Sequence, residues 1–223
     1  MNKKKIANLA PYGYITPITV ILIGFVIVSV IISIVLSFTR YNIMTPPTFY
    51  GLKNYERLVT DTKFMKALFN TLKLMVMIVP LQMILSLIVS VFLVSHRHML
   101  IGKIANSVIF IPVLCSNAAT GVIWRELLNG KIPAVETFFG LFGIKASMLL
   151  GNAKTALAVV AAVAIWKMLG YYVVIYSSGL LGISESFYEA AKVDGASTWK
   201  TYWSIVFPIM KPMHATVAVL TAL

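Results

Sequence analysis

A long uncharged run near the N-terminus constrains the fold of this chain more than any other feature. No acidic or basic side chain occurs between Lys5 and Arg40, and the segment 15–38 is almost wholly apolar. At about 1.5 Å of rise per residue, a helix over this segment is long enough to cross about 30 Å of hydrocarbon. Lysines precede the run, as they do in a signal peptide, but the apolar core of a signal peptide has only about 7–15 residues. This run is much longer. We therefore predict an uncleaved membrane-spanning helix.

The composition of the whole chain supports this interpretation. Of 223 residues, 59% are apolar and 12% are charged, whereas soluble domains carry about 45–50% and about 25%. This excludes disorder, a disulfide scaffold and an ordinary cytosolic domain. The single cysteine, Cys115, excludes an internal disulfide framework and a Cys-cluster metal site. The net charge is +12, but the basic residues flank apolar runs, so we expect contact with membrane lipid and no nucleic-acid partner.

Five apolar runs predict an all-α, polytopic helical bundle with a single domain over 1–223. The expected spans are 15–38, 68–94, 104–124, 156–178 and, in part, 212–223. The last run gives only about 18 Å of helix, which would end in mid-bilayer. We therefore expect the natural protein to continue beyond Leu223. Between the spans, we expect a short surface helix from about Asn54 and an interfacial or re-entrant helix within 132–144.

The expected orientation places the N-terminus in the cytoplasm. The loops 40–66 and 125–155 then lie outside, whereas 95–103 and 179–204 lie inside. Lysine and arginine counts do not separate the two sides clearly, because the outer loops are also basic. The orientation therefore depends on the first helix, which usually dominates.

The loop at 184–204 has the pattern of two short helices joined by a sharp turn. Ser186 followed by Glu189 predicts a capping box at the start of the first helix. Gly195 suits the left-handed end of that helix, and Ser197 can cap the second. Helical spacing places four residues on one face, namely Phe187, Ala190, Ala191 and Asp194. The small alanines would let a soluble partner approach closely.

The same loop resembles the cytoplasmic signature of ABC importer permeases. That signature is Glu-Ala-Ala, three residues, Gly, nine residues, Ile, one residue and Leu-Pro. The chain has Glu189-Ala190-Ala191, Gly195, Ile205 and Phe207-Pro208, so Phe207 is its one departure. The surrounding 188–196, the outer stretch 49–55 and Asn70-Thr71 resemble the carbohydrate branch, the maltose-type permeases.

The resemblance implies a bacterial inner-membrane protein with a six-helix core. It implies the permease subunit of an ATP-driven importer for a sugar or oligosaccharide. The loop 184–204 would be the coupling helix, and Glu189 would pair with a basic residue of an ATP-binding cassette subunit. The residues implied in coupling are Phe187, Glu189, Ala190, Ala191, Asp194 and Gly195. Further implied partners are a second, homologous permease subunit and an extracytoplasmic solute-binding protein. ATP and Mg would be bound by the ATPase subunit, so we expect no cofactor in this chain.

Two observations favour an ATP-driven permease subunit independently of the resemblance. The chain contains no Gly-x-x-x-x-Gly-Lys-Ser/Thr phosphate-binding loop, so we expect a non-enzymatic subunit whose ATPase is a separate protein. None of the seven acids falls in a predicted span, whereas proton- or sodium-coupled carriers usually need an intramembrane carboxylate or histidine. The alternatives are an ABC permease for another solute, such as glycerol phosphate or a peptide, and an ATP-independent carrier or channel.

Lys167 is the one charge deep inside a predicted span. It could line a substrate path, or it could bond to carbonyls of a neighbouring helix. Mid-span polar residues more often bond between helices than bind substrate. The candidate path residues are Gln82, Asn117, Trp166, Lys167, Tyr171 and Tyr172. The pair His96 and His98 lacks nearby acids or cysteines, so we predict no metal site, and we identify no catalytic residues.

Overall fold

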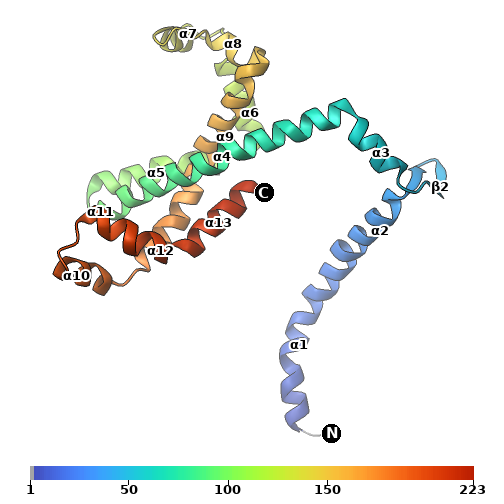
Figure 1. Cartoon of the computed structure of the whole chain (residues 1–223), viewed down its shortest axis with the longest axis horizontal. Helices are drawn as coiled ribbons and strands as arrows, with labels where there is room; N and C mark the ends of the chain where they lie inside the picture. The colour runs from blue at the N-terminus through green and yellow to red at the C-terminus, as the bar shows by residue number, and fades with distance from the viewer. Residues whose placement is uncertain (1–2) are drawn as a thin grey trace. The chain divides into compact units, whose positions relative to one another are not determined.

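The computed structural model describes residues 3–223, with the side chains of residues 12–152 and 155–223. The chain divides into two compact units, Met1–Leu68 and Phe69–Leu223 (Figure 1). Within the described residues, three helices are long and apolar enough to cross a membrane, namely Tyr12–Ser37, Thr62–Ser95 and Thr155–Leu181. The number rises to five if each of two bent helix pairs forms one span.

The first unit consists of a long apolar helix followed by a small polar module. Its elements are α1 (Lys3–Leu22), the π-helical turn η1 (Ile23–Ile27), α2 (Val28–Ser37), the antiparallel strands β1 (Thr39–Asn42) and β2 (Thr45–Phe49), and α3 (Lys53–Thr60). The Asn54 side-chain amide donates to the carbonyls of Ser37 and Thr39 at 2.8 and 2.9 Å, which ties α3 to the end of α2. The helices predicted over 15–38 and from about Asn54 are both present, whereas the hairpin was not predicted.

The second unit holds most of α4 and all later helices. The elements are α4 (Thr62–Ser95), α5 (Leu100–Leu114), α6 (Asn117–Leu127), α7 (Pro133–Gly140), α8 (Ala146–Gly151), α9 (Ala153–Leu181), α10 (Glu185–Val193), α11 (Thr198–Thr201), η2 (Tyr202–Val206), α12 (Phe207–Ile209) and α13 (Lys211–Ala222). The helices predicted over 68–94 and 156–178 fall inside α4 and α9. The helix expected within 132–144 is α7.

The span predicted over 104–124 consists of two helices separated by a sharp break. Helices α5 and α6 meet at an angle of 99°. Pro112 lies in the last turn of α5 and has no N–H to bond to the preceding turn. Cys115 and Ser116 are then extended, with ψ of 144° and 149°, and the Ser116 hydroxyl accepts the N–H of Ala119 at 3.1 Å. This cap restarts the helix as α6.

A second break separates α12 from α13. The segments Thr198–Ile209 and Lys211–Ala222 meet at 67°. Pro212 lies in the first turn of α13, where its missing N–H is tolerated but would interrupt a continuing helix. The predicted run at 212–223 is therefore a helix that begins at its own sharp bend.

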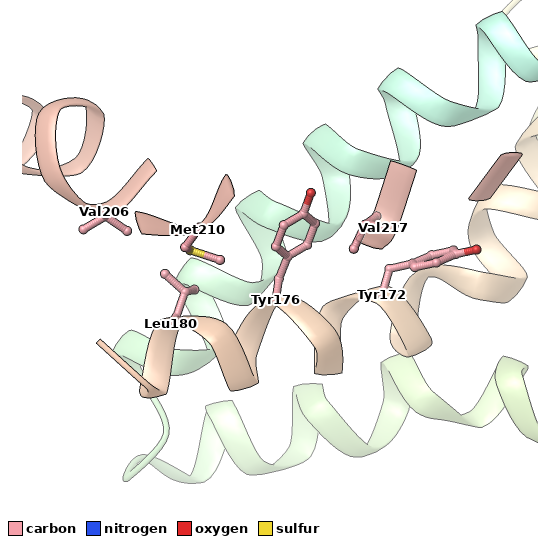
Figure 2. Close-up of a cluster of buried hydrophobic side chains, with 6 residues drawn as sticks. All are labelled: Tyr172, Tyr176, Leu180, Val206, Met210 and Val217. Carbon is pink, nitrogen blue, oxygen red and sulfur yellow. The ribbon is translucent and has the colours of Figure 1, made fainter. Parts of the chain in front are cut away.

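Helix α9 is the centre of the packing in the second unit. Figure 2 shows Tyr172, Tyr176 and Leu180 along one face of α9, with Val206, Met210 and Val217 against them. The spacing of four residues places the three α9 side chains one above another. From α4, the Ser90 hydroxyl donates to the carbonyl of Val173 at 2.9 Å. Helix α9 therefore connects α4 with the C-terminal helices.

The contact between α9 and α5 is close because of one glycine. A Cβ atom at Gly170 would lie 2.5 Å from the carbonyl oxygen of Ile109. Small residues allow such close backbone approach between membrane helices. This contact brings the end of α5 next to the α9 turn that carries Lys167.

The segment between α7 and α9 is held by one carboxylate. The Glu136 side chain accepts the backbone N–H groups of Ser147 and Ala146 at 2.9 and 3.1 Å. The Ser147 N–H bond is the main cause that lowers the pKa of the Glu136 carboxyl below its usual value. Helix α7 is thereby fastened to the first turn of α8.

Candidate functional site

Helix α10 begins two residues earlier than predicted. Ser184 is its N-cap residue, with φ −61° and ψ 139°. Ser186 lies inside the helix, and its hydroxyl is 2.8 Å from that of Ser184. The predicted capping box of Ser186 with Glu189 is therefore wrong, because the last extended residue before the helix is Ser184.

The end of α10 confirms the role expected for Gly195. Its φ is +68°, a conformation that L-residues other than glycine rarely adopt. The N–H of Gly195 bonds to the carbonyl of Lys192 at 3.1 Å, and the N–H of Ala196 bonds to that of Ala191 at 2.9 Å. This pair of bonds is a Schellman motif. The prediction for Ser197 is also confirmed, because its hydroxyl accepts the N–H of Lys200 at 3.3 Å and caps α11.

Helix α10 has one free face and one packed face. The free face carries exposed side chains of five residues, namely Phe187, Glu189, Ala190, Val193 and Asp194. Among the side chains described, neither Glu189 nor Asp194 forms an ion pair, because the single pair present joins Arg125 and Glu126. The free face thus offers two unpaired carboxylates beside the apolar Phe187 and Val193.

The packed face anchors α10 to the rest of the unit. Ala191 is only 3% exposed, and Tyr188 packs against the buried cluster of Figure 2. Burial raises the pKa of the Tyr188 hydroxyl. The prediction that Ala191 shares the exposed face is therefore wrong. A step of one residue turns a helix by about 100°, which separates Ala191 from Ala190.

Val193 is an exposed residue that the sequence reasoning did not identify. It is 88% exposed at the end of α10. Its spacing of three residues from Ala190 places it on the same side of the helix. That spacing was visible in the sequence, but an apolar residue between Lys192 and Asp194 gave no separate functional signal.

Lys167 bonds to the carbonyls at the break between α5 and α6. Its ammonium nitrogen Nζ donates to the carbonyl of Cys115 at 2.6 Å and to that of Pro112 at 3.4 Å. The residue is 8% exposed. The C-terminal end of a helix carries partial negative charge and unpaired carbonyls. Of the two alternatives raised by the sequence, the geometry therefore supports the bond to a neighbouring helix.

The aromatic path candidates divide between core and surface. Tyr172 belongs to the buried cluster, and its hydroxyl donates to the carbonyl of Leu220 at 3.0 Å. Tyr171 is 39% exposed, with its ring centroid 5.3 Å from that of Tyr172. Trp166 is 44% exposed and meets the Trp124 ring edge-on at 5.5 Å.

The two amide candidates also differ. Asn117 is exposed in the first turn of α6. Gln82 is 1% exposed, and within the described part of the chain its amide oxygen and nitrogen have no hydrogen-bond partner. The helix-to-helix bond expected of Gln82 is thus not formed in this chain by itself. None of the six path candidates lines either of the two cavities found at the ends of α4 and α9 and beside α2 among the described residues.

The comparisons with known proteins identify the family. Residues 62–223 match the model of the binding-protein-dependent transport system inner membrane component. The chain belongs to this family. The resemblance of the 184–212 segment to ABC importer permeases is thereby confirmed, and the family places the chain in the inner membrane.

Two curated relatives of this inner membrane component are permeases of sugar transport systems. The chain is 30% identical over 217 residues to the arabinooligosaccharides transport system permease protein AraP of Bacillus subtilis, covering 95% of this chain and 66% of that protein. It is 31% identical over 186 residues to the multiple sugar-binding transport system permease protein MsmF of Streptococcus mutans, covering 82% and 63%. The chain thus spans slightly less than two thirds of the length of these relatives.

A solved structure shares the fold of this inner membrane component. It is the crystal structure of a bacterial alginate ABC transporter in complex with an alginate pentasaccharide-bound periplasmic protein. The TM-score is 0.81 at 19% identity, covering 98% of this chain and 73% of that one. This likeness confirms the predicted all-α, polytopic permease fold.

Proposed function

We propose that this chain acts as the membrane-spanning permease subunit of an ATP-driven importer for a sugar or oligosaccharide. The observation that carries the proposal is the two-faced helix α10. Its free face presents Glu189 and Phe187, and its packed face is fixed through Tyr188 to the cluster formed by the apolar helices. The sugar permeases among the relatives support the substrate class.

In this function, α10 is the coupling helix. Its free face docks on a separate ATP-binding cassette subunit, where ATP and Mg are bound, and Glu189 pairs there with a basic residue. The N-terminus and α10 then lie in the cytoplasm. A second permease subunit completes the path across the membrane, and an extracytoplasmic solute-binding protein delivers the sugar.

The exposed aromatic candidates are the best-suited part of the substrate path. Trp166 and Tyr171 are partly exposed on α9, and aromatic faces suit the apolar faces of sugar rings. Gln82 and Asn117 supply amide groups that can bond to hydroxyls. Lys167 and Tyr172 act in this path only as supports, because their polar atoms already bond to backbone carbonyls.

The test of coupling uses two variants of α10 in cells that carry the complete transporter. Glu189→Lys reverses the docking charge, and Gly195→Val forces a branched side chain into the left-handed turn, at a cost of about 1–2 kcal/mol. We expect both variants to lose uptake of labelled oligosaccharide while remaining in the membrane. A Cβ at Gly195 would contact nothing within 4 Å, so the loss would reflect the turn and not a steric clash.

The matched control is Glu56→Lys, which makes the same charge change at an exposed acid of α3, outside α10. We expect this variant to retain most of its uptake and its ATPase subunit. Normal uptake by both Glu189→Lys and Gly195→Val would contradict the coupling role. Uptake without ATP would favour a carrier or channel, and uptake of glycerol phosphate or a peptide alone would change the substrate class.

A further inference from the structure

A cavity lies where the ends of α4 and α9 meet the start of α5. Its volume is about 180 Å³. Its polar lining comes from Arg97, Lys103, Asn106 and Ser177, and apolar side chains such as Leu93 and Leu181 complete the wall. The four polar residues are all able to donate hydrogen bonds, and none of them is an acid. Such a lining is suited to an anion with several acceptor oxygens.

The two cations of this cavity are not neutralised by the chain itself. Among the described side chains, neither Arg97 nor Lys103 forms an ion pair with a carboxylate. The Arg97 Nε–H donates to the His98 ring nitrogen Nε2 at 3.0 Å, which holds the guanidinium in place. Its terminal N–H groups can then bind an anion in the bidentate way that phosphate favours.

The location of the cavity indicates a lipid as the source of that anion. Leu181 is the last residue of α9, and Ser95 is the last residue of α4. The cavity therefore lies at the end of two long apolar helices, where a membrane helix meets the headgroup layer. Leu181, which is 51% exposed, and the buried Leu93 give the cavity an apolar wall beside its two cations, which a free phosphate ion would not need.

We propose that this cavity binds the phosphate headgroup of an anionic phospholipid. Arg97 and Lys103 contact the phosphate, Asn106 and Ser177 donate to its oxygens or to the glycerol, and an acyl chain lies along Leu93 and Leu181. Because Leu181 directly precedes the loop that carries α10, the cavity opens on the same side as α10. If α10 lies in the cytoplasm, as the proposed function requires, the bound lipid belongs to the cytoplasmic leaflet. The leaflet therefore rests on the proposed function, whereas the binding of an anionic phospholipid does not.

The test measures lipid binding directly on the complete transporter. The full chain, purified together with its partner subunits, is titrated with phosphatidylglycerol or phosphatidylcholine, and native mass spectrometry counts the lipids retained. We expect preferential retention of phosphatidylglycerol. Arg97→Gln and Lys103→Gln should each weaken it about fivefold, and the double variant about 25-fold, since each cation near an anionic surface contributes about 1 kcal/mol.

Lys200→Gln is the matched control, because Lys200 is an exposed cation that lies outside the cavity and beyond α10. We expect it to leave phosphatidylglycerol binding within about twofold of the wild type, because charge attraction falls off beyond about one Debye length. An equal loss in Lys200→Gln would indicate general surface attraction and would overturn the proposal. So would equal retention of both lipids.

Two further outcomes identify a different occupant. If inorganic phosphate displaces phosphatidylglycerol at similar concentrations, the cavity is a site for a soluble anion, and the lipid assignment is wrong. If the double variant loses the ATPase subunit but keeps its phosphatidylglycerol, the cavity is a protein contact. Transport is not the readout, so failure here is separate from failure of the coupling proposal, which Glu189→Lys tests by uptake.

Discussion

The two bent helix pairs of the second unit differ in what holds each bend. At the break between α5 and α6, the buried ammonium of Lys167 bonds to the carbonyls of Cys115 and Pro112. At the break between α12 and α13, Met210 is 2% exposed and packs in the buried cluster with Val206 and Val217. A proline lies near each bend. The first bend is therefore held by polar contacts, chiefly those of Lys167, and the second by apolar packing.

This difference teaches how a break can be tolerated among apolar helices. Carbonyls that a break leaves unpaired need a partner, because lipid supplies none. At the first break, Cys115 and Ser116 are exposed, and the Lys167 ammonium donates a hydrogen bond to the Cys115 carbonyl. At the second, the chain resumes a helix immediately after Met210, so packing is sufficient. A charge inside a span can thus support backbone geometry and need not bind substrate.

The largest loss of stability should come from truncating the buried side chain at the bend between α12 and α13. Met210→Ala removes a buried side chain from the cluster, and we expect a loss of at least about 2 kcal/mol, since lipid does not replace the lost contacts. Met210→Leu, which nearly conserves volume, should cost less than about 1.5 kcal/mol. Thermal unfolding of the purified transporter, followed by tryptophan fluorescence, measures both. Equal stability of the two variants would contradict the packing account.

An intermediate effect should come from removing the polar contact at the other bend. Lys167→Met leaves the Cys115 carbonyl unpaired, and we expect a loss of about 1–2 kcal/mol. Faster hydrogen exchange should be confined to α5 and α6. The control is Lys73→Met, which removes an exposed lysine of α4 and should change little. If Lys167→Met altered sugar affinity while leaving stability and exchange unchanged, the residue would belong to the substrate path instead.

The smallest effect should come from one hydroxyl near the packed bend. Tyr172→Phe removes the bond to the Leu220 carbonyl but keeps the ring in the cluster, so we expect a loss of about 0.5–1.5 kcal/mol. Its neighbour supplies the control, because Tyr171→Phe deletes the hydroxyl of an exposed residue and should be nearly neutral. Chemical denaturation of the two variants side by side makes the comparison. A larger loss in Tyr171→Phe would show that the exposed ring has a partner.

Much of the helical framework could be predicted from the sequence. Apolar runs with few charges are a property of the chain itself, so the positions of α4 and α9 followed from composition and length. The turn at Gly195 and the cap at Ser197 were also predictable, because both depend on residues a few positions apart. Each of these features is decided by local chemistry.

The features that were not predicted depend on partners distant in the sequence. Pro112 alone did not reveal the break, since proline is often accommodated within membrane helices. The partner of Lys167 lies 52 residues away, and the burial of Ala191 depends on which side of α10 meets the cluster. The sequence also did not reveal that the buried Gln82 amide has no hydrogen-bond partner within the described residues.

Tyr188 gives the short helix α10 a mechanical property. Its ring touches a cluster built from α4, α9 and the C-terminal helices, so α10 is not a freely swinging arm. If α10 couples as proposed, a lateral force on Phe187 or Glu189 would be shared among several long helices at once. The packing of one phenol ring would then decide how completely a displacement of α10 reaches the rest of the bundle.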